Sequence, residues 1–102
     1  MPQFLIVARD GRDPDALARR MAARPAHFEG IKELVANGNL LSGGALLDDA
    51  GKMAGSYTVC EFPDRAGLDA WLAREPYVQQ GVWKDIEVMP IRIAVRDGKM
   101  MP

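Results

Sequence analysis

The order of hydrophobic patterns along this chain of 102 residues is the feature that most constrains its fold. Helix-like spacing begins near Asp13 and occurs again between Asp64 and Pro76. Strand-like apolar stretches lie at residues 3–9, 40–47, 56–62 and 82–88. The resulting β-α-β-β-α-β order predicts a ferredoxin-like α+β domain, in which a four-stranded antiparallel sheet carries both helices on one face.

Prolines, glycines and acidic residues predict where these elements begin, bend and end. Asp13 suits the N-cap of the first helix, and Pro25 predicts either a kinked helix or two helices that meet there. Gly43 and Gly44 interrupt the second strand, which predicts a bulge or room for a ligand. A change in the apolar phase near Pro90 predicts a bulge or bend in the last strand.

Two apolar stripes mark the faces of the predicted helices. The second helix is expected to bury Leu68, Trp71 and Leu72. A turn of helix over residues 76–80 is expected after it. The stripe of the first helix comprises Leu17, Met21, Phe28, Ile31, Leu34 and Val35.

The predicted domain covers residues 1–96 and leaves residues 97–102 as a frayed tail. Its first strand carries apolar residues on both faces, whereas a sheet with one wet face should alternate cleanly. The sheet face that the helices leave open therefore needs a cover. A second copy of the chain related by a twofold axis is the simplest cover, so the sequence predicts a homodimer through that face.

Composition predicts a cytoplasmic protein with neither nucleic acid nor membrane as a partner. Hydrophobic residues make up 48% of the chain, and the formal net charge of -1 offers no basic surface for polyanions. No apolar run approaches the roughly 18 residues that span a bilayer, and the N-terminus has no signal-peptide pattern. The single cysteine, Cys60, fits a reducing compartment and a buried, inert thiol.

His27 is the only histidine and lies at the border of the first apolar stripe. It could be a general acid or base facing a cleft, or a half-buried helix residue bonded to a carbonyl. Glu75 stands at a helix end next to Pro76, where it could orient His27 or could simply be solvated. A negative charge at a helix C-terminus opposes the helix dipole, which favours a specific role for Glu75.

Further residues could hold a ligand, and each has a plainer structural alternative. Arg24 could bind a substrate carboxylate or form a surface ion pair with Glu29. Tyr77 could donate a hydrogen bond to a ligand or only pack a cavity wall. Ser42, Gly43 and Gly44 could expose backbone amides to an oxyanion, or could mark only a strand irregularity. Ser56 could point into the same cleft or merely begin a strand.

Several segments together carry a resemblance to a known family. They include Arg24-Pro25-Ala26-His27-Phe28, the stretch 38–46 and Glu75-Pro76-Tyr77-Val78. In these segments the chain resembles the YCII-related (YciI-like) family. The resemblance implies a dimeric α+β barrel fold and an active site that pairs His27 with Glu75 in a cleft between sheet and helices. Family members usually have aspartate where this chain has Glu75, and often proline where it has Ala45.

Two functions follow from these residues. The first is a cofactor-independent acid–base enzyme that carries out lyase, isomerase or elimination chemistry on a small polar or aromatic metabolite. In it His27 would move a proton, Glu75 would orient His27, and Arg24 or backbone near Gly43 would hold an anionic group. The second is a non-catalytic dimeric module that binds a small molecule. One histidine and one cysteine show no metal-ligand spacing, so we expect no metal and no other cofactor.

Overall fold

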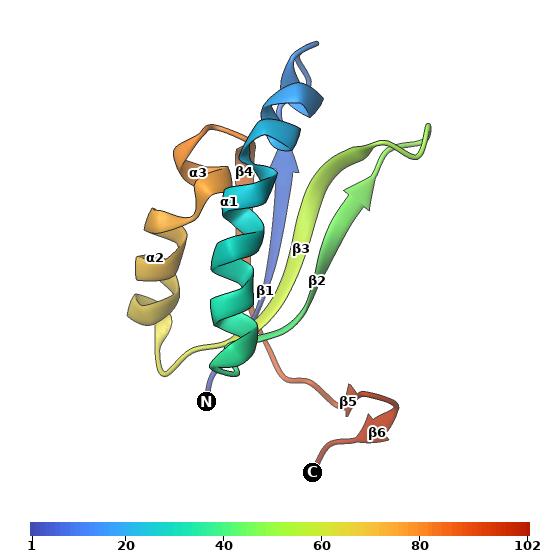
Figure 1. The fold of residues 1–102 in the computed structure, drawn as a ribbon. Coiled ribbons are helices and arrows are strands. Elements are labelled where there is room, and N and C mark those ends of the chain that lie inside the picture. The colour runs from blue at the N-terminus through green and yellow to red at the C-terminus, as the bar shows by residue number, and fades with distance from the viewer.

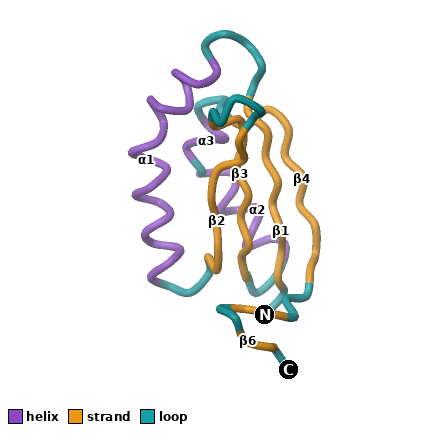
Figure 2. Tube along the Cα trace, turned by 90° about the vertical axis from the view of Figure 1, so that its right-hand side faces the viewer, coloured by secondary structure: helices purple, strands orange, loops and turns teal.

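The computed structural model describes residues 1–102 and is built on an antiparallel sheet with the strand order β2-β3-β1-β4 (Figure 2). The first strand is central, because it pairs antiparallel with both β3 and β4. The strands are β1 (Gln3–Asp10), β2 (Leu40–Leu47), β3 (Met53–Glu61) and β4 (Trp83–Ile91). This arrangement confirms the predicted ferredoxin-like fold.

All three helices lie on one side of this sheet, as Figure 1 shows. They are α1 (Ala16–Ala36), α2 (Arg65–Arg74) and the single turn α3 (Pro76–Gln79). The carboxylate of Asp64 accepts the Gly67 backbone N–H at 2.8 Å, so the predicted start of the second helix is confirmed. None of these helices has both the length and the apolar composition that crossing a membrane requires.

The core lies between the helices and the sheet. Alternate residues of β1 point into it, because successive side chains of a strand face opposite ways. Leu68 and Trp71 of α2 are buried, as predicted. The cluster comprises Phe4, Ile6, Ala8, Ala23, Leu34, Cys60, Phe62, Leu68, Trp71, Tyr77, Val82 and Trp83.

The first helix is continuous through Pro25, so the predicted alternative of two helices that meet there is wrong. The predicted N-cap is wrong, because the helix begins at Ala16 after Asp15 and has no side-chain cap. The carboxylate of Asp13 binds the Arg19 guanidinium at 2.6 Å instead.

The buried face of α1 differs from its apolar stripe. Leu34 is buried, but Leu17, Met21, Phe28 and Val35 are each at least 37% exposed. The helix turns Arg20 and Ala23 toward the sheet instead. The small Ala23 side chain permits close packing of α1 on the sheet. The Arg20 guanidinium binds a buried carboxylate, described below.

The irregularities of the sheet do not lie where the sequence placed them. Strand β2 is continuous through Gly43 and Gly44, and its register shifts lie nearer its two ends. A Cβ atom on Gly44 would come within 2.9 Å of the Tyr57 ring, so this glycine makes room for a neighbouring side chain. Pro90 pairs in register with Phe4, and the shift between β1 and β4 occurs at the other end of the pair.

The C-terminal residues form a small hairpin where the sequence predicted a frayed tail. Strands β5 (Val95–Arg96) and β6 (Lys99–Met100) pair antiparallel and project from the body of the protein (Figure 1). Asp97 and Gly98, which connect them, have φ angles of 53° and 73°. Two left-handed residues with an Asp-Gly sequence are typical of a tight hairpin turn.

Cys60 is completely buried on β3, and its Sγ atom lies 3.7 Å from the Phe4 carbonyl oxygen. Burial raises the pKa of this thiol to about 11, because the apolar surroundings disfavour the thiolate. The predicted burial of the thiol is confirmed, and near neutral pH it carries no charge.

We expect Gly55→Ala to lower the free energy of unfolding by about 1–3 kcal/mol, the usual cost of overpacking. A Cβ atom at Gly55 would lie 2.4 Å from the Ala8 carbonyl oxygen, a backbone atom of the neighbouring strand. Gly30→Ala is the matched control, because nothing lies within 4 Å of its Cβ position in a helix. It should gain up to about 1 kcal/mol. Urea denaturation measures both, and equal stabilities would contradict the packing.

Cys60 should also make stability depend on pH in the alkaline range. Since the folded state raises its pKa from 9.0 to about 11, the unfolded chain loses the thiol proton first. The contribution of the thiol is therefore complete below about pH 9 and decreases as the pH rises toward about 11. Stability curves of wild type and Cys60→Ala should converge over this range, and parallel curves would show an accessible thiol.

Candidate active site

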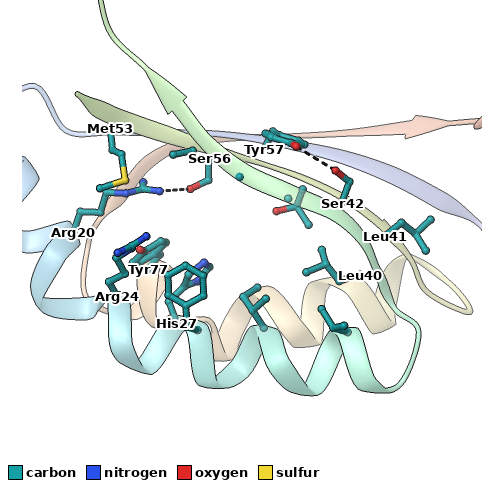
Figure 3. A pocket seen from close by; sticks show the side chains of 17 residues that line it. Arg20, Arg24, His27, Leu40, Leu41, Ser42, Met53, Ser56, Tyr57 and Tyr77 are labelled. Carbon is teal, nitrogen blue, oxygen red and sulfur yellow. Dashed lines mark hydrogen bonds between the residues drawn. The ribbon is translucent and has the colours of Figure 1, made fainter. Parts of the chain in front are cut away.

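A cavity of about 460 Å³ lies between α1 and the β2–β3 side of the sheet (Figure 3). It collects most of the residues that the sequence singled out, although they come from four separate elements. Those that line it are Arg24, His27, Ser42, Gly43, Gly44, Ser56 and Tyr77. Glu75 does not line this cavity and lies behind His27 instead.

The Nδ1 atom of His27 is hydrogen-bonded to the Oε1 atom of Glu75. An ionised carboxylate can only accept, so Nδ1 carries the proton and the lone pair of the neutral ring is on Nε2. The His27 side chain is 13% exposed and that of Glu75 is 1% exposed. The pair therefore has a buried orienting group and an imidazole that forms part of the cavity wall.

Glu75 occupies the junction between two helices, where it is the C-cap of α2 and the N-cap of α3. Its Oε1 atom also accepts the Tyr77 backbone N–H at 3.2 Å. The carboxylate thus lies at the N-terminal end of α3, where a negative charge suits the peptide dipoles. From the sequence we expected the negative charge of Glu75 to be unfavourable at the C-terminal end of α2. The start of α3 at Pro76 offsets that unfavourable interaction.

Aromatic rings hold the imidazole in place. The Tyr77 ring stacks on His27 with centroids 3.8 Å apart and an interplanar angle of 11°. Trp83 and Phe28 meet the same imidazole edge-on. Tyr77 is buried, and burial raises the pKa of its phenol, although Arg20 and Arg24 oppose that rise. The ring packs the cavity wall, and its hydroxyl stays protonated.

The structure adds a buried ion pair that the sequence did not predict. One terminal nitrogen of Arg20 donates to both carboxylate oxygens of Asp10 at 3.1 Å, with both side chains almost fully buried. Burial raises the pKa of Asp10, and the Arg20 charge and hydrogen bonds work against that rise. The Arg20 guanidinium also lies 4.9 Å from the centroid of the Tyr77 ring. Arg20 precedes His27 by seven residues, a spacing that places both on one face of a helix. That spacing could have marked Arg20 as a site residue, but it does not identify Asp10 as its partner.

Ser56 is held between Arg20 and a tryptophan. Its Oγ atom accepts from Arg20 at 3.0 Å, as Figure 3 shows, and from the indole N–H of Trp83 at 3.2 Å. A hydroxyl has two lone pairs, so both of its acceptor positions are filled. Its own O–H remains available as a donor, and Ser56 lines the cavity.

Arg24 lines the cavity without an ion-pair partner. The alternative pairing with Glu29 or another acid does not occur, and Glu29 binds Lys32 at 3.1 Å. The Arg24 guanidinium lies 4.8 Å from the centroid of the Phe28 ring. Its charge is therefore free to meet an anionic group in the cavity.

The Ser42–Gly44 segment shapes the rim of the cavity. The Ser42 hydroxyl is hydrogen-bonded to the Tyr57 hydroxyl at 3.1 Å (Figure 3). Gly44 leaves the space that the Tyr57 ring occupies. One of the two hydroxyls donates to the other, and the segment itself is exposed.

The cavity has a cationic end and an apolar end along the axis of α1. Arg20, Arg24 and His27 gather at the first, and Ile31 and Val35 follow one and two turns further along the helix. Leu40 and Leu41 face this second end from the sheet (Figure 3). No three His, Cys, Asp or Glu side chains are grouped as a metal site.

The chain matches a known family in its sequence and known structures in its fold. Residues 3–92 match the model of the YCII-related domain. Protein YciI of Escherichia coli is 32% identical over 95 residues, which cover 87% of this chain and 95% of that protein.

Two solved structures share the fold. The 5-chloro-2-hydroxyhydroquinone dehydrochlorinase TftG of Burkholderia phenoliruptrix, in complex with 2,5-dihydroxybenzoquinone, superposes with a TM-score of 0.77 at 23% identity. That match covers 88% of this chain and 93% of TftG. A dimeric ferredoxin-like protein from an uncultured marine organism has a TM-score of 0.54 at 18% identity, over 93% of this chain and all of that one. From its family match and its identity to YciI, this chain belongs to the YCII-related family.

Proposed function

We propose that this protein is a cofactor-independent acid–base enzyme that acts on a small, planar, oxygen-bearing metabolite. The observation that carries the proposal is the His27–Glu75 hydrogen bond, with the carboxylate buried and the imidazole in the wall of a cavity. A buried carboxylate that fixes the tautomer of a histidine makes the other ring nitrogen a base.

In the proposed reaction the Nε2 atom of His27 takes a proton from the bound ligand. Glu75 stabilises the imidazolium that forms, because its negative charge lies at hydrogen-bond distance. The ligand gains negative charge as it loses the proton, and that charge moves onto its oxygen atoms. Arg24 and the Ser56 O–H stabilise those oxygens as charge develops. Isomerisation or elimination follows, according to whether the proton returns or a leaving group departs with its electron pair.

The shape of the cavity supports a ligand with one anionic or phenolic end and an apolar body. Its cationic end suits an enolate, phenolate or carboxylate, and its other end offers Ile31, Val35 and Leu40. TftG is named for removing hydrogen chloride from a chlorinated hydroxyhydroquinone, and its structure holds a dihydroxybenzoquinone. Ligands of that kind are planar rings rich in oxygen, and we propose the same general class here.

We also propose that the working form is a homodimer through the sheet face opposite the helices. Leu5 and Val7 of β1 point to that face and are only half-buried, and so are Val59 and Met89. The marine ferredoxin-like protein of similar fold is described as dimeric. The cytoplasm remains the compartment we propose, because the lone thiol of Cys60 has no disulfide partner.

Proton abstraction by His27 can be tested without a known product. We expect the protein to catalyse exchange of ligand C–H protons with deuterated water for some members of a panel of hydroxyquinones, hydroxybenzoates and keto acids. His27→Gln should lower the exchange rate by about 10²-fold or more, and Glu75→Gln by a similar factor. Exchange is followed by proton NMR, and circular dichroism checks the fold of each variant.

Glu29→Gln is the matched control, since it changes an exposed carboxylate on α1, the helix that carries His27. Its exchange rate should equal that of wild type. If ligands of the panel bind but no variant changes the exchange, the enzyme proposal is wrong. The protein would then be the alternative, a dimeric small-molecule-binding module.

We expect Val7→Lys to convert the dimer into monomers, because two copies would bury lysines against each other at the centre of the open face. Lys32→Glu is the control, since this residue is exposed on α1, on the opposite side of the sheet. Light scattering coupled to gel filtration measures the mass. A monomeric wild type, or a dimeric Val7→Lys, would exclude this face as the interface.

A further inference from the structure

A second cavity, here called the rear groove, lies between α1 and α2 on the far side of the His27–Glu75 pair. Its volume is also about 460 Å³, and most of its lining is polar. Ala26, Gly30 and Glu33 line it from α1, and Trp71 and Arg74 line it from α2. The first cavity, which His27 lines, is here called the ligand cavity. Glu75 belongs to the wall of the rear groove and not to the wall of the ligand cavity.

The two oxygens of the Glu75 carboxylate differ sharply in their surroundings. Oε1 is hydrogen-bonded to His27 and to the Tyr77 backbone N–H. Oε2 is buried and has no hydrogen-bond partner in the protein. Because Oε1 is turned toward His27 and Glu75 lines the polar rear groove, water in the groove is the candidate donor for Oε2.

We infer that the rear groove is the route by which the His27–Glu75 pair exchanges protons with bulk water. The groove would hold water that hydrogen-bonds to Oε2, while the ligand occupies the cavity on the other side. The inference rests on the proposed function, since it describes how the pair returns to its starting charge.

The proton balance is simple. One proton leaves the ligand and binds to Nε2 of His27, which makes the ring an imidazolium. The Nδ1 proton then passes to Glu75, and a half-turn of the neutral carboxyl group brings it to the groove, where water accepts it. Histidine is again neutral and glutamate is again a carboxylate, with one proton gained from the ligand and one released. When the product departs, Nε2 gives its proton to water in the cavity, and Nδ1 takes a proton back from groove water through Glu75, which restores the Nδ1–H form.

Charge favours the groove over the cavity as the exit. Arg24 lines the ligand cavity without an ion-pair partner, and its positive charge opposes a protonated water molecule there. In the groove the charges of Glu33 and Arg74 have opposite signs, so no such opposition arises. A bound ligand would also cover Nε2, whereas Nδ1 already faces Glu75.

Gly30 offers a way to fill the groove without disturbing the cavity. Nothing lies within 4 Å of its Cβ position, so a larger side chain fits. A leucine in a helix leans toward the preceding turn, which here contains Ala26, another residue of the groove wall. Gly30→Leu should therefore displace groove water. Gly30→Ala gives the same backbone change without filling the groove, and Ala26→Leu fills it from the neighbouring turn.

The test measures exchange of the His27 Nδ1 proton with water by NMR, and the single histidine makes its signal unambiguous. The protein is measured alone and with 2,5-dihydroxybenzoquinone added as a probe to occupy the ligand cavity. We expect Gly30→Leu and Ala26→Leu to slow the exchange about tenfold or more, because exchange of a buried proton depends on access to water. Gly30→Ala should match wild type, and the probe should not slow the wild type.

Equal exchange rates in wild type and both leucine variants would overturn the inference. So would exchange that the probe slows in wild type, since that would make the ligand cavity the route. If the probe does not bind, the rates of the unliganded proteins decide the question. None of these measurements needs turnover, so they remain informative if the isotope-exchange test of the enzyme proposal fails.

Discussion

The buried carboxylate of Glu75 is the constraint on which the arrangement of the site depends. An ionised side chain that is 1% exposed has to be met by hydrogen-bond donors, and two of them come from α1 and from the first turn of α3. The contact therefore ties the middle of the longest helix to the junction of the other two. Because removing a donor from a buried ionised group costs about 1–3 kcal/mol or more, this contact restricts how α1 can lie on the sheet.

A second buried charge performs the same task at the other end of the site. Arg20 reaches from α1 to Asp10 at the end of the central strand and to Ser56 on the neighbouring one. Pairs of this kind add little net stability, because desolvation offsets the attraction between the charges. They do select one packing among several, and here they turn the polar Arg20 inward while Leu17 and Phe28 of the same helix stay exposed.

The site also shows how this chain accommodates its differences from the usual family pattern. The family resemblance led us to expect aspartate before Pro76, and the longer side chain of Glu75 still reaches the Nδ1 atom of His27. The same oxygen caps α3, so the extra methylene does not cost the helix its start. Ala45 stands where proline is common, and strand β2 continues through it without a break in register. Both differences leave the cavity and the histidine–carboxylate contact in place.

Much of this protein follows from local pattern. Alternating apolar residues, a helix-capping Asp64 and the Glu75-Pro76 junction each depend on neighbours within a few positions, so the sequence alone determined the element order and the ferredoxin-like sheet. It also marked His27 and Glu75 as candidates for one pair, through their residue types and the family resemblance.

Tertiary structure alone decided which way α1 faces and what its charges meet. Asp10 and Ser56 are 10 and 36 residues from Arg20, and no spacing rule connects partners on different elements. The same holds for the rear groove, which exists only because α2 lies beside α1 with Glu75 between two cavities. Short-range periodicity determines secondary structure, whereas the partners of buried charges depend on where distant segments meet.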